Sequence, residues 1–323
     1  MANGSACVRR RLHRKARPDV PAGPAIVVTG ASSGIGLATA LAFAREGARL
    51  ALLGRDAAAL DRAAEQCRAE GGSALTCALD IADTAAVEDA ARRVVEAYGV
   101  IDVWVSCAAV LAFGPFTALP PELFHRVVET NLVGCANGAR AALRQFRAQG
   151  DRGVLINTSS VLGIISEPHV SAYVATKFAV RGFTACLRQE MRNVPGIHIC
   201  AVLPIAVDTP MYQKAANYFG RRARSIFPVL PPERIARRIV WLARNPRRES
   251  IVSLSGHLLR LAAALAPLLL ERLVGRAGPP LQFQRDAEAS GPGNAFEARE
   301  PHAIRGGWRR YWAGRLAGKK QLR

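Results

Sequence analysis

The chain alternates between short apolar runs and longer segments that favour helix. Seven runs rich in valine, isoleucine, leucine and alanine predict buried β-strands. These runs lie at 25–30, 49–55, 73–80, 101–109, 153–160, 197–204 and 249–254. The intervening segments predict helices at 35–47, 56–70, 84–98, 121–148, 171–193 and 232–244. Because strands and helices alternate at this spacing, we expect an α/β, doubly wound Rossmann-type fold over residues 23–255, with a mainly parallel seven-stranded sheet flanked by helices.

The pattern changes after Ser255. Residues 256–277 are strongly apolar and are interrupted by Pro267, so they predict a helical segment that is too short to span a bilayer. Such a segment either packs on the domain or on a partner subunit, or lies as a helix or hairpin in a membrane interface. Residues 278–298 contain several prolines and glycines and predict a loop or linker. We therefore expect an apolar and basic C-terminal extension that ends in a Pro/Gly-containing tail, 278–323.

Positive charge is concentrated at the two ends of the chain. The formal net charge is +19, and residues 1–19 and 299–323 supply 12 of these charges. A protein that binds nucleic acid specifically would carry its basic surface on the folded body, so no specific nucleic-acid partner is expected. We interpret residues 1–22 as a disordered N-terminal tail, and both tails favour weak contact with anionic membranes or polyanions.

The seven cysteines are scattered and form no C-x-x-C pair or metal-ligand spacing. Their odd number and apolar surroundings predict buried free thiols in a reducing compartment, with no metal site. The N-terminus lacks the apolar run of a secretory signal, and no uncharged apolar stretch of about 18 residues predicts a spanning helix. We therefore expect a cytoplasmic protein, with peripheral membrane association through 257–276 and the basic tails as an alternative.

The stretch TGASSGIG at 29–36 follows the first predicted strand directly and opens a helix. Its three glycines allow a sharp turn and a close approach of the backbone to a pyrophosphate. The helix N-terminus then offers unpaired N–H groups to the anion. This strand–turn–helix context predicts a dinucleotide site. The cofactor contacts that we expect here are Thr29, Gly30, Ser32, Ser33, Gly34, Ile35 and Gly36.

The end of the second strand indicates which dinucleotide binds. Sites for NAD usually place a carboxylate there to hold the ribose 2′-hydroxyl, whereas this chain has Gly54 followed by Arg55. An arginine can bind a 2′-phosphate with two donors, so Arg55 favours NADP(H). Asp56 follows immediately and leaves NAD(H) as the alternative.

Three residues of the second half of the domain complete a specific pattern. Ser160 lies thirteen residues before Tyr173, and Lys177 lies four residues after it. Together with the T-G-x-x-x-G-x-G turn, this spacing resembles the short-chain dehydrogenase/reductase family over residues 23–255. The resemblance implies a carbonyl/secondary-alcohol oxidoreductase that uses NADP(H) or NAD(H) and assembles as a homo-dimer or tetramer.

Other positions match the family pattern or depart from it. The resemblance implies that Asp80 holds the adenine amino group and that Asn131 lies at a kink of the fourth helix. It also implies cofactor contacts at Ile81, Asn131, Tyr173, Lys177, Pro204 and Thr209. Two departures alter the pocket: the segment 106–109 reads Ser-Cys-Ala-Ala where the family has N-N-A-G, and Ile205 replaces a glycine after the sixth strand.

Carbonyl reduction needs a hydride from the nicotinamide and a proton for the developing alkoxide. A tyrosine has an unperturbed pKa near 10, and lowering it by about three units requires roughly 4 kcal/mol of stabilisation of the phenolate. Positions four apart share a helix face. We therefore expect Lys177, together with the oxidised nicotinamide, to lower the pKa of Tyr173, the proton donor and acceptor.

The resemblance assigns the remaining catalytic roles. Lys177 also holds the nicotinamide ribose hydroxyls, Ser160 hydrogen-bonds the substrate oxygen, and Asn131 supports a water chain to Lys177. Structural alternatives are an ordinary surface pair for Tyr173 and Lys177, and a buried polar role for Asn131. Ser160 is alternatively a helix or turn cap, although Ser159 is available for that role.

The segment 208–230, after the sixth strand, is expected to line the substrate site. Its apolar residues favour a small lipophilic carbonyl or alcohol as substrate. They are Met211, Tyr212, Tyr218, Phe219 and Phe227. Three arginines of the segment are placed at the mouth of the site, where they would meet an anionic group or be simply solvated. They are Arg221, Arg222 and Arg224.

Two other functions stay open from the sequence. The altered segment 106–109 favours a catalytically weak, NADP-binding sensor or scaffold protein. The basic tails and the apolar segment 257–276 favour a peripheral membrane protein in which these segments carry the main function.

Overall fold

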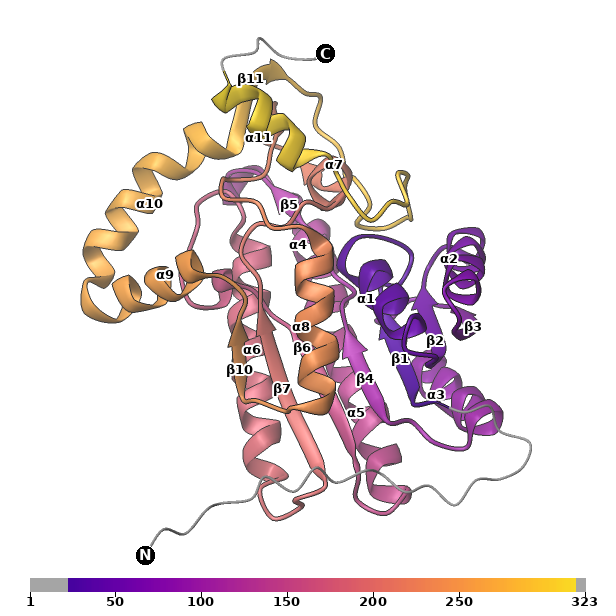
Figure 1. The fold of residues 1–323 in the computed structure, drawn as a ribbon. Coiled ribbons are helices and arrows are strands. Elements are labelled where there is room, and N and C mark those ends of the chain that lie inside the picture. Colours follow the sequence, from indigo (N-terminus) through magenta and orange to yellow (C-terminus); the bar gives the residue numbers. More distant parts are fainter. Residues whose placement is uncertain (1–22, 318–323) are drawn as a thin grey trace, which may run out of the picture.

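The computed structural model describes residues 23–317; the predicted tail 1–22 and the end of the C-terminal tail, 318–323, lie outside the described residues. Seven strands form one sheet in the order β10-β7-β6-β4-β1-β2-β3, and all neighbouring strands are parallel (Figure 1). The strands are β1 (Ala25–Thr29), β2 (Arg49–Gly54), β3 (Ser73–Ala78), β4 (Val103–Ser106), β6 (Gly153–Thr158), β7 (Ile197–Leu203) and β10 (Glu249–Ile251). The predicted fold class is confirmed.

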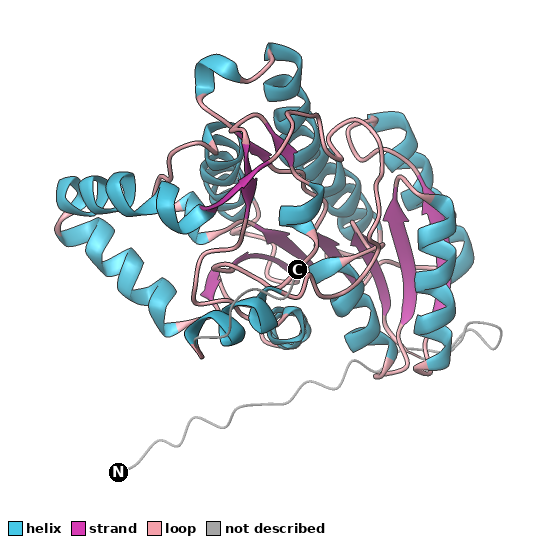
Figure 2. Ribbon diagram, turned by 90° about the horizontal axis from the view of Figure 1, so that it is seen from above, coloured by secondary structure: helices cyan, strands magenta, loops and turns pink. Residues whose placement is uncertain are grey.

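Helices cover both faces of this sheet (Figure 1, Figure 2). Residues of α1, α2 and α8 share one buried cluster with the sheet, and residues of α3, α5 and α6 share the other. The bounds are α1 (Gly34–Ala44), α2 (Ala57–Ala69), α3 (Thr84–Tyr98), α5 (Gly134–Ala148), α6 (Ser171–Glu190) and α8 (Pro232–Arg244). The strands are apolar throughout because helices bury both faces of the sheet.

Strand β1 shows how the sequence pattern builds these two layers. All five of its residues are buried. Ile26 and Val28 enter one cluster, and Ala25 and Val27 enter the other, because successive side chains of a strand point to opposite faces. The strand lies between β2 and β4, where the order of the strands along the chain reverses. In open α/β sheets the crevice at this point, outside the carboxyl ends of the strands, is where ligands bind.

The long helix predicted over 121–148 is broken in the middle, as expected. It consists of α4 (Pro121–Val128), one π-helical turn (Glu129–Val133) and α5. Asn131 lies inside the π turn, so its predicted place at a kink is confirmed. Such single π turns within α-helices often mark functional positions.

The apolar segment of the C-terminal extension is helical, as predicted, but the segment after it differs in part from its prediction. The apolar segment forms two helices, α9 (Leu254–Leu265) and α10 (Pro267–Gln282), which project from the sheet as a bent pair, here the α9–α10 hairpin (Figure 1, Figure 2). Of residues 278–298, predicted as a loop, 278–287 instead finish α10 and form β11 (Phe283–Ala287), which pairs with β9 (Arg221–Ala223), while 288–298 are irregular. Within residues 23–317, no helix has the length and hydrophobicity needed to cross a membrane.

The basic tail also folds onto the domain. Its last described helix, α11 (Trp308–Leu316), buries Trp308 and Trp312 against Val229. Trp308 donates its indole N–H to the carbonyl of Thr209 at 3.2 Å, and its backbone N–H to the carboxylate of Asp208 at 2.7 Å. Residues 299–317, expected as part of a basic tail, instead pack on the domain, because two large aromatic side chains anchor them to the loop after β7.

Residues 288–307 connect β11 to α11, and we call this segment the strap. It runs as irregular chain past α7 (Met211–Lys214) and α1 (Figure 1). Its backbone approaches the loop after β7 so closely that a Cβ at Gly293 would lie 2.3 Å from the Ala215 carbonyl carbon. A Cβ at Gly306 would lie 2.3 Å from the carbonyl oxygen of Thr209. The strap therefore packs backbone against backbone at both ends.

Candidate active site

A cavity of about 780 Å³ opens at the carboxyl ends of the central strands. The glycine-rich turn after β1, the segment after β4 and the start of α6 form its inner wall. The loop after β7, the α9–α10 hairpin and the strap form its outer wall. The cavity therefore joins the predicted cofactor, catalytic and substrate segments, and adds the α9–α10 hairpin and the strap, whose place at the site the sequence did not predict.

The glycine-rich turn has the geometry of an anion cradle. Gly30 and Gly34 have φ values of +67° and +55°, which residues with a side chain rarely adopt. A Cβ at Gly36 would lie 2.1 Å from the carbonyl oxygen of Gly30. Ser33 caps α1 with no side-chain hydrogen bond. The N–H of Gly34 donates to the carbonyl of Ala303 at 2.9 Å, so the following N–H groups of the first turn, at Ile35 and Gly36, are left for a ligand. These residues fit the pyrophosphate of a dinucleotide.

The departure at 106–109 leaves the support of this turn intact. The Thr29 hydroxyl oxygen accepts hydrogen bonds from the backbone N–H groups of Cys107 and Ala108, both at 3.1 Å. A Cβ at Gly30 would lie 2.8 Å from the Cα of Ala108, so the turn lies directly on this segment. The Cys107 thiol contacts the hydroxyl of Thr158 at 3.4 Å. Backbone groups, which any residue supplies, make the essential contacts.

Ser160, Tyr173 and Lys177 all line the cavity. The Lys177 ammonium donates to the carbonyl oxygen of Thr158 at 2.9 Å and lies 5.2 Å from the centre of the Tyr173 ring. The Ser160 hydroxyl oxygen accepts from the backbone N–H of Leu162 at 3.1 Å. Ser160 thus also caps a short helical turn, while Ser159, the predicted alternative cap, donates to the Lys177 carbonyl instead.

The expected lowering of the Tyr173 pKa depends on Lys177 and on the oxidised nicotinamide together, and it stays a prediction. Burial raises the pKa of Tyr173 above its ordinary value; a hydrogen bond with Ser160 opposes this rise, and the Glu167 carboxyl adds to it. Burial also lowers the pKa of Lys177 to about 8. In the protein alone, desolvation of the phenolate therefore dominates the pKa of Tyr173, while the Lys177 ammonium bonds to the carbonyl of Thr158.

Asn131 contacts backbone and side chain on two other elements. Its Oδ1 accepts from the N–H of Val110 at 2.8 Å, and its Nδ2 donates to the carbonyl of Val110 at 2.9 Å and to the hydroxyl of Thr176 at 3.2 Å. These bonds tie the π turn to the segment after β4 and to α6. Asn131 thus holds α6, which carries Tyr173 and Lys177, in place, while its part in a water chain stays a prediction.

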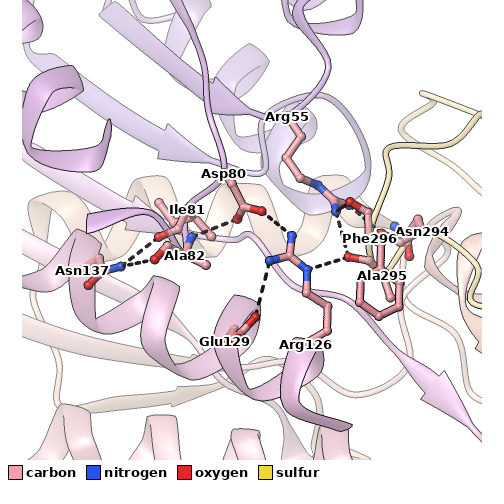
Figure 3. A network of polar contacts seen from close by, with 10 residues as sticks. All are labelled: Arg55, Asp80, Ile81, Ala82, Arg126, Glu129, Asn137, Asn294, Ala295 and Phe296. Carbon is pink, nitrogen blue, oxygen red and sulfur yellow. Dashed lines mark hydrogen bonds and ion pairs between the residues drawn. The ribbon is translucent and has the colours of Figure 1, made fainter. Parts of the chain in front are cut away.

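Arg55 and Asp80 lie at the cavity wall, but protein groups bind both (Figure 3). The Arg55 guanidinium donates to the backbone carbonyls of Asn294 at 2.6 Å, Ala295 at 2.9 Å and Phe296 at 3.0 Å, all in the strap. Burial lowers the pKa of Arg55, and repulsion from the nearby Arg126 guanidinium lowers it further.

Asp80 forms an ion pair with Arg126, whose guanidinium also donates to the carbonyl of Ala295 at 2.9 Å. Burial disfavours the charged form of Asp80, but the N–H of Ala82 and the guanidinium outweigh it and hold the pKa of Asp80 below its ordinary value. The strap, α4 and the end of β3 thus share one charged network (Figure 3). The predicted contact of Asp80 with adenine stays a prediction.

The remaining predicted cofactor positions line the same cavity. They are Ser32, Ile35, Ile81, Pro204 and Thr209. Ile205, the second departure from the family pattern, is 9% exposed and packs in the core. A Cβ on Gly256, at the start of α9, would lie 3.3 Å from the Ile205 side chain. The absence of a side chain at Gly256 of α9 therefore leaves room for Ile205, which is larger than the glycine of the family pattern.

Part of the predicted substrate segment is placed elsewhere. Met211, Tyr212 and Phe227 line the cavity, whereas Tyr218 and Phe219 pack in adjacent hydrophobic clusters. The predicted arginines at the mouth do not line it. Arg224 is 5% exposed and donates to backbone carbonyls at the end of α10, so it fixes the hairpin and does not meet substrate.

The cavity also contains titratable residues that sequence reasoning missed. Glu167, Lys214, Arg299 and His302 all line it. Burial raises the pKa of Glu167 to about 7 and lowers the pKa of Lys214 to about 8. One signal was present in the sequence: a chain with 44 Lys and Arg residues contains only five lysines, and Lys214 is one of them.

The family model for the short chain dehydrogenase matches residues 24–218, more than half of the chain. The uncharacterized oxidoreductase YxnA of Bacillus subtilis is 32% identical over 251 residues, which cover 77% of this chain and 70% of YxnA. The probable oxidoreductase EphD of Mycobacterium bovis is 39% identical over 184 residues, 57% of this chain but only 31% of EphD.

Solved structures give the same result. An alcohol dehydrogenase from the archaeon Thermococcus sibiricus, complexed with 5-hydroxy-NADP, superposes with a TM-score of 0.62 at 29% identity over 71% of this chain and 95% of its own. The actinorhodin polyketide ketoreductase with NADPH superposes with a TM-score of 0.62 at 26% identity over the same shares. Both similarities leave part of this chain uncovered.

Proposed function

Because the chain belongs to the short-chain dehydrogenase family, we propose that it is an NADP(H)-dependent oxidoreductase that interconverts a lipophilic carbonyl compound and its secondary alcohol. The observation that carries this proposal is the convergence of Ser160, Tyr173 and Lys177 on one cavity with the glycine-rich turn. When bound, the nicotinamide supplies or accepts the hydride. The protein supplies the proton, the orientation of the substrate and the exclusion of water.

Tyr173 would deliver the proton to the substrate oxygen during reduction and take it back during oxidation. The Ser160 hydroxyl, which lines the same cavity as Tyr173, would donate to the same substrate oxygen and stabilise the charge that develops there. The neighbouring Lys177 ammonium favours the phenolate electrostatically once the phenol has lost its proton. Lys177 would also hold the ribose hydroxyls that lie next to the nicotinamide.

The substrate class follows from the outer wall of the cavity. Apolar side chains of the loop after β7 and of the α9–α10 hairpin make up most of this wall. They include Ile205, Met211, Leu258, Leu259, Leu273 and Leu281. Apolar walls of this extent favour an aliphatic or polycyclic carbonyl compound over a small polar one.

A turnover panel tests this proposal. The full-length protein is incubated with lipophilic ketones and with small hydrophilic ketones, each with NADPH and with NADH, and oxidation of the cofactor is followed by absorbance. We expect turnover with lipophilic ketones and a preference for NADPH. Binding of NADPH without oxidation by any member of the panel would favour the alternative of a catalytically weak sensor or scaffold.

We also propose that the α9–α10 hairpin lies on an anionic bilayer surface. Its exposed large side chains are leucines, between 43% and 75% accessible: Leu254, Leu258, Leu261, Leu265, Leu268, Leu269, Leu273 and Leu281. Arg260, Arg272 and Arg276 on the same helices complement anionic headgroups, against one acid, Glu271. Because the hairpin also lines the cavity, a lipophilic substrate could enter from the membrane.

Flotation with vesicles tests this surface. We expect binding to vesicles that contain phosphatidylserine, and a large loss of binding in the double variant Leu261→Glu/Leu269→Glu. Neither of these leucines lines the cavity. Equal flotation of wild type and variant would contradict the proposal, and a shift from oligomer to monomer in the variant would instead place the hairpin between subunits. The homo-dimer or tetramer stays a prediction, which light scattering tests.

A further inference from the structure

The described residues contain only two lysines, Lys177 and Lys214, and both line the same cavity. Their side chains are deeply buried, with Lys177 3% exposed and Lys214 6% exposed. Lys177 donates to the carbonyl of Thr158 at 2.9 Å. Among residues 23–317, no group hydrogen-bonds or pairs with the Lys214 ammonium. A side chain buried this deeply whose ammonium makes no hydrogen bond or ion pair within residues 23–317 is available to an anion in the cavity, so this position suggests an anionic ligand.

The surroundings of Lys214 identify which part of the cavity it serves. Its ammonium interacts electrostatically with Glu300, Asp56 and Arg55. Asp56 and Arg55 directly follow β2, which is where a dinucleotide site distinguishes a ribose 2′-hydroxyl from a 2′-phosphate. Lys214 therefore reaches this end of the site from the opposite wall, at the end of α7.

Arg55 is not available for the same task. Both of its terminal nitrogens already donate to carbonyls of the strap, at 2.6 Å to Asn294 and 2.9 Å to Ala295. A phosphate that took these donors would leave strap carbonyls unpaired, at a cost. Arg299 of the strap, in contrast, is exposed, lines the cavity and has no ion-pair partner among the described residues.

The strap also fixes the position of Lys214. The backbone N–H of Asn294 donates to the Lys214 carbonyl at 2.7 Å, and a Cβ on Gly293 would lie 2.4 Å from the same carbonyl oxygen. The carbonyl of Ala303 accepts from the N–H of Gly34 in the glycine-rich turn at 2.9 Å. One segment thus joins the phosphate-binding turn, Arg55 and Lys214 into a single corner of the cavity.

We infer that Lys214, assisted by Arg299, binds the 2′-phosphate of NADP(H), and that Arg55 instead holds the strap against the nucleotide site. This inference rests on the proposed function and refines it. A compact ammonium on an apolar stem suits a phosphate monoester in a partly closed corner, and a charge-assisted hydrogen bond there contributes more to affinity than one on an open surface.

Equilibrium binding of NADPH and NADH, measured by nicotinamide fluorescence on the full-length protein, tests this inference. In Lys214→Met we expect NADPH to bind about 10- to 100-fold more weakly and NADH to bind as in wild type, which also shows that the variant is folded. Lys214→Arg should retain the preference for NADPH. Arg285→Met, which removes one exposed charge outside the cavity, is the matched control and should change neither affinity.

The binding results distinguish failure of the Lys214 inference from failure of the proposed oxidoreductase function. An unchanged NADPH-to-NADH ratio in Lys214→Met would overturn the inference. Equal weakening of both cofactors would also overturn it, because Lys214 would then serve the pyrophosphate. A wild-type protein that binds both cofactors equally would overturn the inference but leave the oxidoreductase proposal intact. Failure of the wild type to bind either cofactor would refute the proposed function itself.

Discussion

The substitution Arg55→Met should loosen the strap while leaving the preference for NADPH in place. Arg55 donates three hydrogen bonds to strap carbonyls, two of them partly shielded from solvent and one, to Phe296, exposed. A hydrogen bond to a charged donor contributes about 1.5–3 kcal/mol. Arg126 still binds the carbonyl of Ala295 in the variant, so we use the lower value for the two shielded bonds.

The expected loss is then about 3 kcal/mol of local stability, which corresponds to roughly a 100-fold increase in the opening of the strap. Hydrogen exchange measures this opening at those backbone N–H groups of the strap that donate hydrogen bonds to the domain. Two such amides are those of Gly291, bonded to Asn217, and of Asn294, bonded to Lys214. Their exchange should accelerate in Arg55→Met, while amides of β1 should exchange as in wild type.

Arg62→Met is the matched control. Arg62 also contacts the strap, through Glu300 at 3.3 Å, but both side chains are more than half exposed. Such surface pairs contribute about 0–1 kcal/mol, so exchange in the strap should change by less than roughly tenfold. Unchanged exchange in Arg55→Met would refute the reasoning, and a loss of the NADPH preference in this variant would return the 2′-phosphate to Arg55.

Glu167, whose pKa burial raises to about 7, raises the pKa of Tyr173. Glu167→Gln should therefore shift to lower pH the ascending limb of the pH–rate profile for alcohol oxidation, where the rate increases as Tyr173 loses its proton, and an unshifted limb would contradict this coupling. Lys214 has a pKa of about 8 and is charged below that pH. The preference for binding NADPH over NADH should therefore decline above pH 8 in wild type but persist in Lys214→Arg. A preference that stays constant with pH in both proteins would be inconsistent with a lysine that binds the 2′-phosphate. Gly30→Ala places a Cβ 2.8 Å from the Cα of Ala108 at a φ of +67°. It should therefore lower the free energy of unfolding, measured in urea titrations, by about 1–3 kcal/mol and weaken the binding of both NADPH and NADH. Wild-type affinity for both cofactors would show that the turn tolerates a side chain.

The sequence predicts the sheet well because each central strand is buried on both faces. Such strands appear as uninterrupted apolar runs, as in β1, and their bounds agree with the structure to within a few residues. The glycine-rich turn is equally predictable, since only glycine permits its positive φ values and close contacts. Local constraints of this kind are visible in a single sequence.

The strap was not predictable from its composition. Its contacts with Arg55 and Gly34 use backbone carbonyls, which every residue carries and which no sequence pattern reveals. The prolines, glycines and charges of 278–323 therefore indicated a tail. A usable signal was the placement of Trp308 and Trp312, two of the four tryptophans in the chain, because large aromatic residues are rarely left in a solvated tail.

The pKa of Tyr173 also could not be predicted from the sequence. The four-residue spacing of Tyr173 and Lys177 correctly places the ammonium beside the ring. It does not reveal burial, which raises the pKa of Tyr173 in this structure. Desolvation depends on every element around the cavity, including the hairpin and the strap, and therefore emerges only from the fold.

The central claim is that the Tyr173 hydroxyl transfers the proton in a dinucleotide-dependent reaction. Its most direct test compares wild type with Tyr173→Phe, in turnover of a lipophilic ketone and in NADPH affinity. We predict that the variant binds NADPH as wild type does and loses turnover by roughly 100-fold or more. A variant that keeps wild-type turnover with unchanged NADPH affinity would contradict the account.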